Sequence, residues 1–309
     1  MGLQTRTSLR RQEKASIWKG YLRMEQLVIN LLNGISYGMV LFLIASGMSV
    51  VMGAMNITNL AHGVLYMIGG YVGWTVAVKF GASFWIGALA GGLAAGLVGM
   101  GIERGFLRFL YKQGNEQVLL TFGFVYILTN LSLWIWGGWP RMPFTAEFLS
   151  GSFGIMGRVY PKARMANIVI GSFMAVLLWW LQDRTRVGAM VRAGMDNKEM
   201  AMGLGINLER VFALVFFFAS FIAGVAGVLG AQLMGVYNAL GLDVLLLALI
   251  VIIVGGVGSV QGALLGGLLI GVIDAFGRAL FPKFAMFTMY FTMIVILLVR
   301  PSGLLGRRV

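Results

Sequence analysis

Apolar residues run through this chain in long blocks, and short stretches rich in glycine, asparagine or arginine separate them. A helix needs roughly 20 consecutive apolar residues to cross the hydrocarbon core of a bilayer, and most of these blocks approach that length. We therefore predict an all-α, polytopic integral membrane helix bundle of about eight or nine spans. The expected spans are 26–52, 57–79, 84–109, 117–138, 164–182, 208–235, 242–257, 261–280 and 284–300.

Two polar or glycine-rich stretches, Met52–Gly63 and Gly255–Gly262, interrupt otherwise apolar blocks. Non-helical backbone persists at membrane depth only when it is buried in protein or lines a wet cavity. Both interrupted segments are therefore candidates for a transport pathway or a gate, and short surface turns are the alternative interpretation. The candidate pathway residues are Asn56, Asn59, His62, Gly255, Gly256, Gly258 and Ser259.

Residues 183–210 form the most conspicuous polar stretch and hold five of the 24 Lys and Arg residues. We expect Gly194 to break the chain, after which Asp196 or Asn197 caps a short helix that ends near Gly203. A helix of this length is not stable alone, so a partner surface against its methionine-bearing face would stabilise it. An interfacial helix that rests on lipid is the alternative.

The distribution of Lys and Arg among the short loops predicts an orientation. The 183–210 loop, the segment from Arg104 to Lys112 and the tail from Arg300 are basic, so we expect them in the cytoplasm. The connection 139–163 then lies outside. This connection is an exception to the preference for Lys and Arg in cytoplasmic loops, because it carries Arg141, Arg158 and Lys162, and Arg164 follows directly.

Residues 1–23 differ from the rest of the chain because they are basic and contain no long apolar run. We treat 1–23 as a basic or disordered tail, or an upstream extension, and 24–309 as one transmembrane domain. With the C-terminus inside, nine crossings place the tail outside and eight place it inside, so the sequence leaves its side open.

Composition narrows the functional classes. Hydrophobic residues make up 59% of the chain and charged residues 11%, against about 25% charged in a soluble domain. The net charge of +13 fits basic loops that face anionic lipid headgroups rather than a nucleic-acid partner. Cysteine is absent and His62 is the single histidine, which argues against a metal centre or a bound cofactor. GGVGSVQG (255–262) lacks the Gly-Lys-Ser/Thr ending of a phosphate loop, so energy must come from an ion gradient or another subunit.

Few ionisable residues lie inside the apolar blocks. Asp274 and Arg278 are four residues apart, a spacing that predicts a structural ion pair on one helix face. A gradient-driven carrier usually needs several intramembrane acids, and here only Asp274 qualifies well. A membrane-embedded enzyme would need a partner for His62, and Ser259 is the one tempting candidate.

Several sequence blocks resemble one known family. They are NGISYGMVLFLIASGMSVVMG (33–53), NITNLAHGVLYMIGGYV (56–72), AGMDNKEMAMGLGINLERV (193–211), FIAGVAGVLGAQLMGV (221–236), IVGGVGSVQGALLGGLLIGV (253–272) and RPSGLLGR (300–307). Together they resemble the permease subunits of branched-chain amino acid ABC importers, the LivH-like group of binding-protein-dependent transport permeases. The resemblance runs from about Met24 to Arg308 and leaves out residues 1–23.

The resemblance implies a non-enzymatic transport permease in a bacterial inner membrane, with its C-terminus in the cytoplasm. Its expected partners are a second permease, two cytoplasmic ATPases and a periplasmic substrate-binding protein. The second permease is a second copy or a related chain, and the ATPases bind ATP and Mg. The expected cargo is a branched-chain or related amino acid, or a small amide or organic acid. The resemblance implies that eight residues couple the permease to the ATPase: Asp196, Asn197, Lys198, Glu199, Met200, Met202, Gly203 and Gly205.

Overall fold

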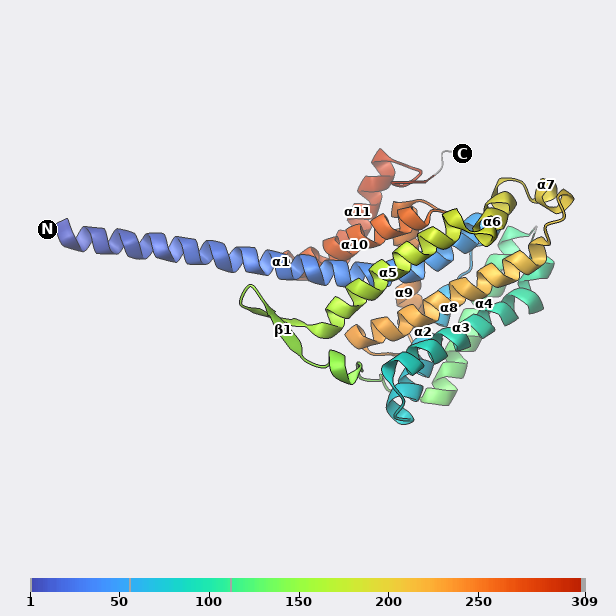
Figure 1. The fold of residues 1–309 in the computed structure, drawn as a ribbon, viewed down its shortest axis with the longest axis horizontal. Coiled ribbons are helices and arrows are strands. Elements are labelled where there is room, and N and C mark those ends of the chain that lie inside the picture. Colours follow the sequence, from blue (N-terminus) through green and yellow to red (C-terminus); the bar gives the residue numbers. More distant parts are fainter. Residues whose placement is uncertain (1, 56, 112, 307–309) are drawn as a thin grey trace.

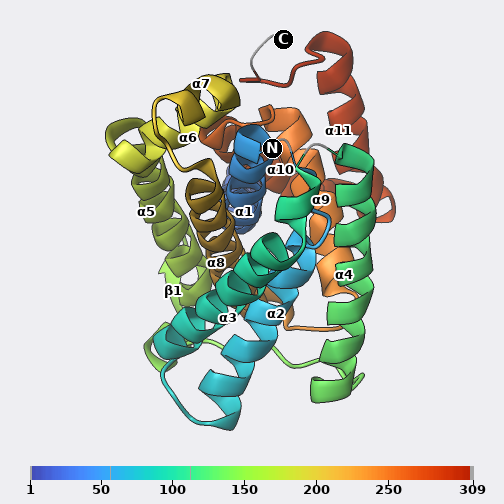
Figure 2. The same cartoon turned by 90° about the vertical axis from the view of Figure 1, so that its right-hand side faces the viewer.

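The computed structural model describes residues 2–55, 57–111 and 113–306. Within that part of the chain, seven helices are long and apolar enough to cross a membrane. They form an all-α bundle (Figures 1 and 2). The helices are α1 (Gly2–Met55), α2 (His62–Trp74), α3 (Phe84–Gly105), α4 (Gly114–Trp136), α5 (Lys162–Arg184), α6 (Arg186–Asp196), α7 (Lys198–Gly203), α8 (Leu208–Met234), α9 (Leu240–Gly255), α10 (Val260–Leu280) and α11 (Ala285–Val299).

Helix α1 is the central element of the bundle. Its apolar part, Met24–Met55, is the most deeply buried of the spans. Its N-terminal part continues as helix away from the bundle (Figure 1). Residues 2–23, for which the sequence suggests a basic or disordered tail, are therefore helical in continuity with the first span. The division of the chain at residue 23 stays a prediction.

Glycine allows the central helices to approach each other closely. A Cβ atom at Gly34 of α1 would lie 2.6 Å from the Cα of Val272 in α10. A Cβ atom at Gly69 of α2 would lie 2.3 Å from the Cα of Gly224 in α8. In lipid, where helices gain little from hydrophobic association, such backbone proximity supplies the van der Waals contact that holds a bundle together.

Two of the predicted spans are shorter than a full crossing. The span predicted at 57–79 begins instead at His62, and its last turn, Thr75–Lys79, is a π-helix. Helix α9 has 16 residues, about 24 Å at 1.5 Å per residue, whereas the hydrocarbon core is about 30 Å thick. The N-terminal ends of α2 and α9 meet, because a Cβ at Gly63 would lie 2.0 Å from the Gly241 carbonyl oxygen.

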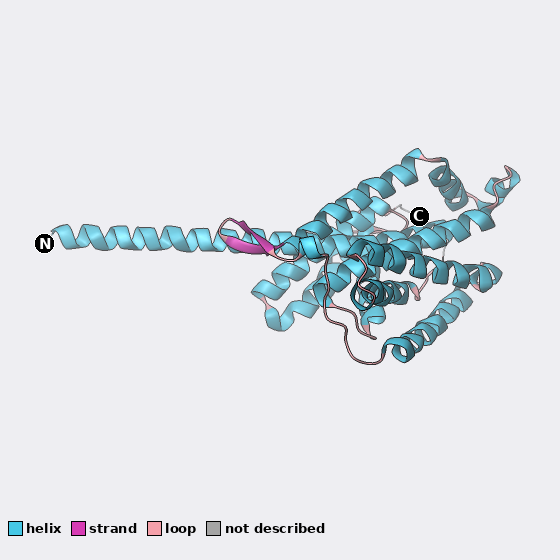
Figure 3. Ribbon diagram, turned by 60° about the horizontal axis from the view of Figure 1, so that its bottom comes forward, coloured by secondary structure: helices cyan, strands magenta, loops and turns pink. Residues whose placement is uncertain are grey.

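A β-hairpin lies at the opposite end of the bundle from α6 and α7 (Figures 1 and 3). Strands β1 (Ser152–Ile155) and β2 (Arg158–Pro161) are antiparallel, with Phe153 opposite Tyr160. The turn residues Met156 and Gly157 have φ of 51° and 81°, as a two-residue hairpin turn requires. This hairpin was not predicted from the sequence, because each of its strands has only four residues.

The basic residues of the hairpin end are held by contacts within the protein. Arg158 forms an ion pair with Glu25 at 3.5 Å, and Arg164 donates a hydrogen bond to the Asn33 amide oxygen. The Arg141 guanidinium lies over the Trp74 ring, 4.7 Å from its centroid. These arginines anchor the connection to the bundle, which gives a structural reason for positive charge at this end.

Candidate functional site

Helix α6 begins directly after α5, at a tight turn. The Thr185 hydroxyl accepts a hydrogen bond from the Gly188 N–H at 3.2 Å and so caps α6. A Cβ at Gly188 would lie 2.1 Å from the Gln182 carbonyl oxygen, so glycine is required for this close approach. The expectation that Gly194 breaks the chain is wrong, because Gly194 lies inside α6 and faces Leu208 and Phe212. Its lack of a side chain lets α6 pack on α8.

Helix α7 follows α6 after a single non-helical residue. The Asn197 side chain accepts a hydrogen bond from the Met200 N–H at 3.0 Å, which satisfies one of the free donors at the helix start. Gly205 has φ of 83° just after the helix, a conformation that favours glycine. A Cβ at Gly203 would meet open space, so no steric reason requires glycine there.

The outer face of α7 is apolar and exposed. Met200 is 67% exposed, Met202 is 54% exposed and Leu204 is 77% exposed. Asp196, the last residue of α6, and Glu199, in the first turn of α7, are also exposed. This small apolar surface with an acidic edge is at the end of the bundle, where α7 projects from the spans (Figure 2).

Met195, near the end of α6, contacts both α1 and the interrupted segment before α10. The irregular part of that segment is 256–259, since α9 ends at Gly255 and α10 begins at Val260. The methyl group of Met195 would lie 2.9 Å from a Cβ at Gly53 and 3.4 Å from one at Gly258. A displacement of α6 would therefore push directly on the end of α1 and on the 256–259 loop.

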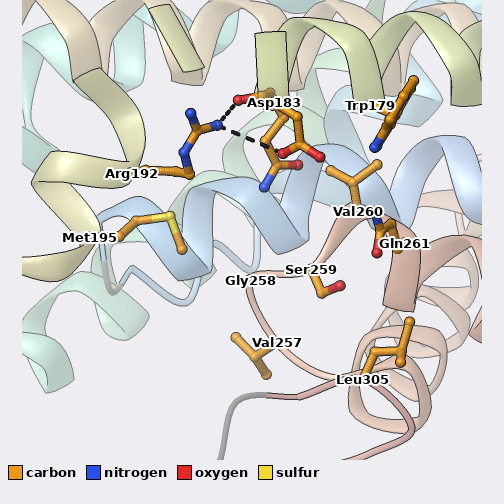
Figure 4. A pocket seen from close by; sticks show the side chains of 11 residues that line it. Trp179, Asp183, Arg192, Met195, Val257, Gly258, Ser259, Val260, Gln261 and Leu305 are labelled. Carbon is orange, nitrogen blue, oxygen red and sulfur yellow. Dashed lines mark hydrogen bonds and ion pairs between the residues drawn. The ribbon is translucent and has the colours of Figure 1, made fainter. Parts of the chain in front are cut away.

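A cavity of about 260 Å³ opens between α5, α6 and the 256–259 loop (Figure 4). Arg192 of α6 forms an ion pair with Asp183 of α5 at 3.7 Å and also donates to the Gln182 carbonyl. Ser259 lines the cavity and caps α10 by accepting a hydrogen bond from the Gly262 N–H at 2.9 Å. Gly258 lines the cavity as well, whereas Gly255 and Gly256 are buried.

The other interrupted segment is packed inside the protein. Asn59 and His62 are each 1% exposed. The Asn59 amide oxygen accepts a hydrogen bond from the Ala61 N–H at 3.0 Å, and the His62 Nε2 lies 3.2 Å from the Ile44 carbonyl oxygen. Leu60 donates its N–H to the Thr121 hydroxyl of α4. These contacts bind the segment to α1 and α4. Asn56 lies outside the described residues.

His62 and Ser259 belong to different packing environments. His62 contacts Ile44 of α1, whereas Ser259 caps α10 beside the cavity of Figure 4. No hydrogen bond joins the two side chains in the described part of the chain, so the structure gives no serine–histidine pair for nucleophilic catalysis. The described residues also contain no group of three or more His, Cys, Asp or Glu side chains that could hold a metal ion.

Asp274 and Arg278 form an ion pair within α10. The Arg278 Nε donates to the Asp274 Oδ2 at 2.8 Å, with the i, i+4 spacing of one helix face. The carboxylate is 4% exposed, and both residues line a polar cavity in the hairpin half of the bundle. Sequence reasoning missed this cavity, and it also missed the one shown in Figure 4, because residues far apart in the chain line both.

The chain is a polytopic membrane protein of the transporter class. It has a bundle of long apolar helices, two shortened helices (α2 and α9) that meet inside the bundle, and an exposed helix, α7, at one end. Residues 30–299 match the family described as "Branched-chain amino acid transport system / permease component". The chain belongs to this family.

Curated relatives of this family are similar over nearly their whole length. The chain is 33% identical to the high-affinity branched-chain amino acid transport system permease protein LivH of Salmonella typhimurium, over 89% of this chain and 94% of the relative. It is 32% identical to BraD, the corresponding permease of Pseudomonas aeruginosa, over 93% and 97%. It is also 33% identical to LivH of Escherichia coli, over 89% and 94%.

Proposed function

We propose that this chain is the membrane-spanning permease of an ATP-driven importer for branched-chain or closely related amino acids. The family and the names of the relatives support this assignment of cargo. The single observation that carries the ATP-driven mechanism is α7, a capped six-residue helix with an exposed apolar face at the end of the bundle. Exposed apolar side chains of this kind suit a protein partner, whose contact would stabilise a helix that is too short to be stable alone.

The partner that fits α7 is a cytoplasmic ATPase, with one ATPase for each of two permease subunits. The ATPases bind ATP and Mg, and this chain supplies the surface that receives their movement. Met200, Met202 and Leu204 would enter an apolar groove of the ATPase, and Asp196 and Glu199 would lie at its rim. The second permease is a second copy or a related chain, and a periplasmic protein would deliver the amino acid to the hairpin end.

The path by which ATPase movement reaches the spans follows from the contacts of α6. A push on α7 moves α6, and Met195 carries that displacement to Gly53 of α1 and Gly258 of the 256–259 loop. The two nucleotide states of the ATPase would then favour two arrangements of the bundle, because they interact differently with α7. The permease itself makes and breaks no covalent bond in this mechanism.

The proposed orientation places α7 and the tail after α11 in the cytoplasm of a bacterial inner membrane. Arg184 at the end of α5, Arg186 in α6 and Arg210 at the start of α8 lie at this end of the bundle, in agreement with the preference for positive charge on the cytoplasmic side. The start of the apolar part of α1, Met24–Met55, contacts the hairpin end through the Glu25–Arg158 pair. Residue 24 would therefore lie on the periplasmic side, and α1 would cross toward the cytoplasm.

Co-purification of the ATPase tests the proposal. The double variant Met200→Glu/Leu204→Glu places two charges on the apolar face of α7 and should abolish co-elution of the ATPase in mild detergent. Met142→Glu is the matched control, because Met142 is 78% exposed in the connection at the hairpin end. Normal co-elution with the double variant would contradict the assignment of α7. A wild-type chain that transports without any ATPase would instead indicate a gradient-driven carrier.

A further inference from the structure

A polar cavity of about 410 Å³ lies in the hairpin half of the bundle, between α1, α5, α8 and α10. It is unusual because its walls come from segments that are otherwise apolar. Eight side chains with hydrogen-bonding or charged groups line it: Gln26, Asn30, Asn33, Ser36, Tyr37, Arg164, Asp274 and Arg278. Within a membrane domain, ionisable side chains are costly unless they pair with one another or face a wet space.

Asp274 provides an acceptor that the protein itself leaves unused. Its Oδ2 accepts the hydrogen bond from Arg278, but its Oδ1 is buried and has no hydrogen-bond partner among the described residues. A buried carboxylate oxygen without a donor is destabilising, because it has lost its water and gained no replacement. A positively charged donor that enters from the cavity, as the wall beside Asp274 opens, would satisfy it.

The opposite charge in the cavity comes from two arginines on different helices. The side chain of Arg278 is 58% exposed, so much of the guanidinium faces open space. Arg164, at the start of α5, is half-buried and donates to the Asn33 amide oxygen. A guanidinium carries five donor hydrogens, and its planar fork matches the two oxygens of a carboxylate.

We propose that this cavity is a transit site for a zwitterionic α-amino acid with an apolar side chain. The α-ammonium group donates to Asp274 Oδ1, and the α-carboxylate accepts from Arg278 and Arg164. Leu233 and Met234 of α8 supply an apolar wall for the side chain. This assignment rests on the proposed function as an amino acid permease, and it adds the residues that recognise the two charged groups of the cargo.

The ion pair also borders a second, smaller cavity of about 270 Å³, toward α11. The remaining lining residues there are apolar: Pro282, Ala285, Met286 and Met289. That cavity offers neither amide groups nor a second arginine, so it lacks a complement for the carboxylate. Of these two cavities, the larger one presents both charges together with neutral hydrogen-bonding groups.

The absence of cysteine allows a direct test, because a single introduced thiol is then the sole site of maleimide labelling. Asn30→Cys places the thiol in the cavity, and the rate of labelling is measured in membrane vesicles that contain the intact chain. The probes are L-leucine, 4-methylpentanoate, which lacks the ammonium group, and 3-methylbutylamine, which lacks the carboxylate. Met142→Cys, at the same end of the bundle and outside the cavity, is the control.

L-leucine should slow the labelling of Asn30→Cys and leave the labelling of Met142→Cys unchanged. Each analogue should protect Asn30→Cys at least about tenfold less effectively than leucine, because it lacks one charge-assisted interaction. Equal protection by the three compounds would overturn the site, and so would no protection by leucine. Adding Asp274→Asn should raise the leucine concentration for half protection by about tenfold, whereas Asp243→Asn should not. An unchanged value with Asp274→Asn would contradict the role of that carboxylate.

These measurements do not depend on the ATPase. Loss of leucine protection in a chain that still co-purifies with an ATPase would remove the transit site and leave the importer assignment intact. Protection in a chain that binds no ATPase would support the site and contradict the ATP-driven mechanism. A monodisperse peak in size-exclusion chromatography in mild detergent shows in each case that a variant chain is folded.

Discussion

The backbone N–H of Gly258 donates a hydrogen bond to the hydroxyl of Ser49 at 3.0 Å, across 209 residues of sequence. This bond attaches the loop between α9 and α10 to the last turns of α1. It lies beside the methyl group of Met195, so α1, α6 and the loop meet at one point. A movement that begins at α6 therefore reaches two elements of the bundle at once.

Ser49→Ala should weaken this junction. The substitution leaves the Gly258 N–H without its acceptor, which costs about 1 kcal/mol of unfolding free energy and lowers the melting temperature by a few degrees. It should also reduce the coupling of ATP hydrolysis to uptake, because the loop can move without α1. Ser46→Ala is the matched control, since the Ser46 hydroxyl donates a hydrogen bond within its own helix, to the Leu43 carbonyl. Equal effects of the two variants would contradict a specific role for the Ser49 bond.

Gly53→Ala should lower the stability of the folded protein, because a Cβ at Gly53 would clash with the backbone of the 256–259 loop. Its Cβ would lie 2.6 Å from the Cα of Gly258, so the backbone must shift at a cost of about 1–3 kcal/mol. Gly101→Ala in α3 provides the contrast, because a Cβ there meets no atom within 4 Å and alanine favours the helix by about 0.5–1 kcal/mol. Thermal unfolding in detergent compares the two. A Gly53→Ala chain as stable as Gly101→Ala would show that the junction is looser than described.

Tyr160→Phe should be neutral or stabilising at neutral pH. The Tyr160 side chain is fully buried beneath the hairpin, and its hydroxyl has no hydrogen-bond partner in the described part of the chain. Removing the hydroxyl should therefore leave stability unchanged or raise it by about 1 kcal/mol. Tyr126→Phe, with an exposed side chain, controls for the substitution itself.

The same residue predicts a loss of stability at high pH. Burial raises the pKa of the Tyr160 hydroxyl to about 12, whereas tyrosine in an unfolded chain ionises near pH 10. Between these values the unfolded state releases a proton that the folded state keeps, so stability falls as the pH rises through that window. The Tyr160→Phe chain should show a shallower decline in melting temperature from pH 10 to 12. An identical decline in the two chains would contradict the assignment.

The proposed orientation predicts opposite accessibility for two methionines. Single variants Met142→Cys and Met202→Cys place a thiol at the hairpin end and on α7. An impermeant maleimide should label Met142→Cys in intact spheroplasts and label Met202→Cys only after the membrane is opened. Labelling of Met202→Cys from the outside would reverse the topology and remove α7 from reach of a cytoplasmic partner.

Much of the fold could be predicted from the sequence because the determinants are local. Apolar blocks predicted the spans within a few residues, and Asn197 does cap the short helix expected after it. The same rules misjudged Gly194, where glycine serves the packing of α6 on α8 instead of ending a helix. From the sequence alone, a glycine that ends a helix cannot be told from a glycine that lets a second helix pack closely.

The candidate sites were harder to predict because they depend on tertiary contacts. Asn59 and His62 are buried and hydrogen-bonded inside the subunit, and their place on the pathway stays a prediction. Asn33, Arg164 and Asp274 gave no joint signal, since more than a hundred residues separate each from the next. Only the antiparallel packing of α1 against α10, with α5 alongside, brings them to one cavity.

The stretch after α11 affects where an affinity tag can be placed. Leu304 and Leu305 donate their N–H groups to the carbonyls of Val254 and Gly255, at 2.8 and 2.9 Å, so this stretch is fastened to the end of α9. An affinity tag fused at the C-terminus would begin within a few residues of that attachment, and Leu305 lines the cavity of Figure 4 together with Met195 of α6. A tag inserted at the tip of the hairpin, between Met156 and Gly157, would instead leave the surface proposed for the ATPase unobstructed for purification of the whole assembly.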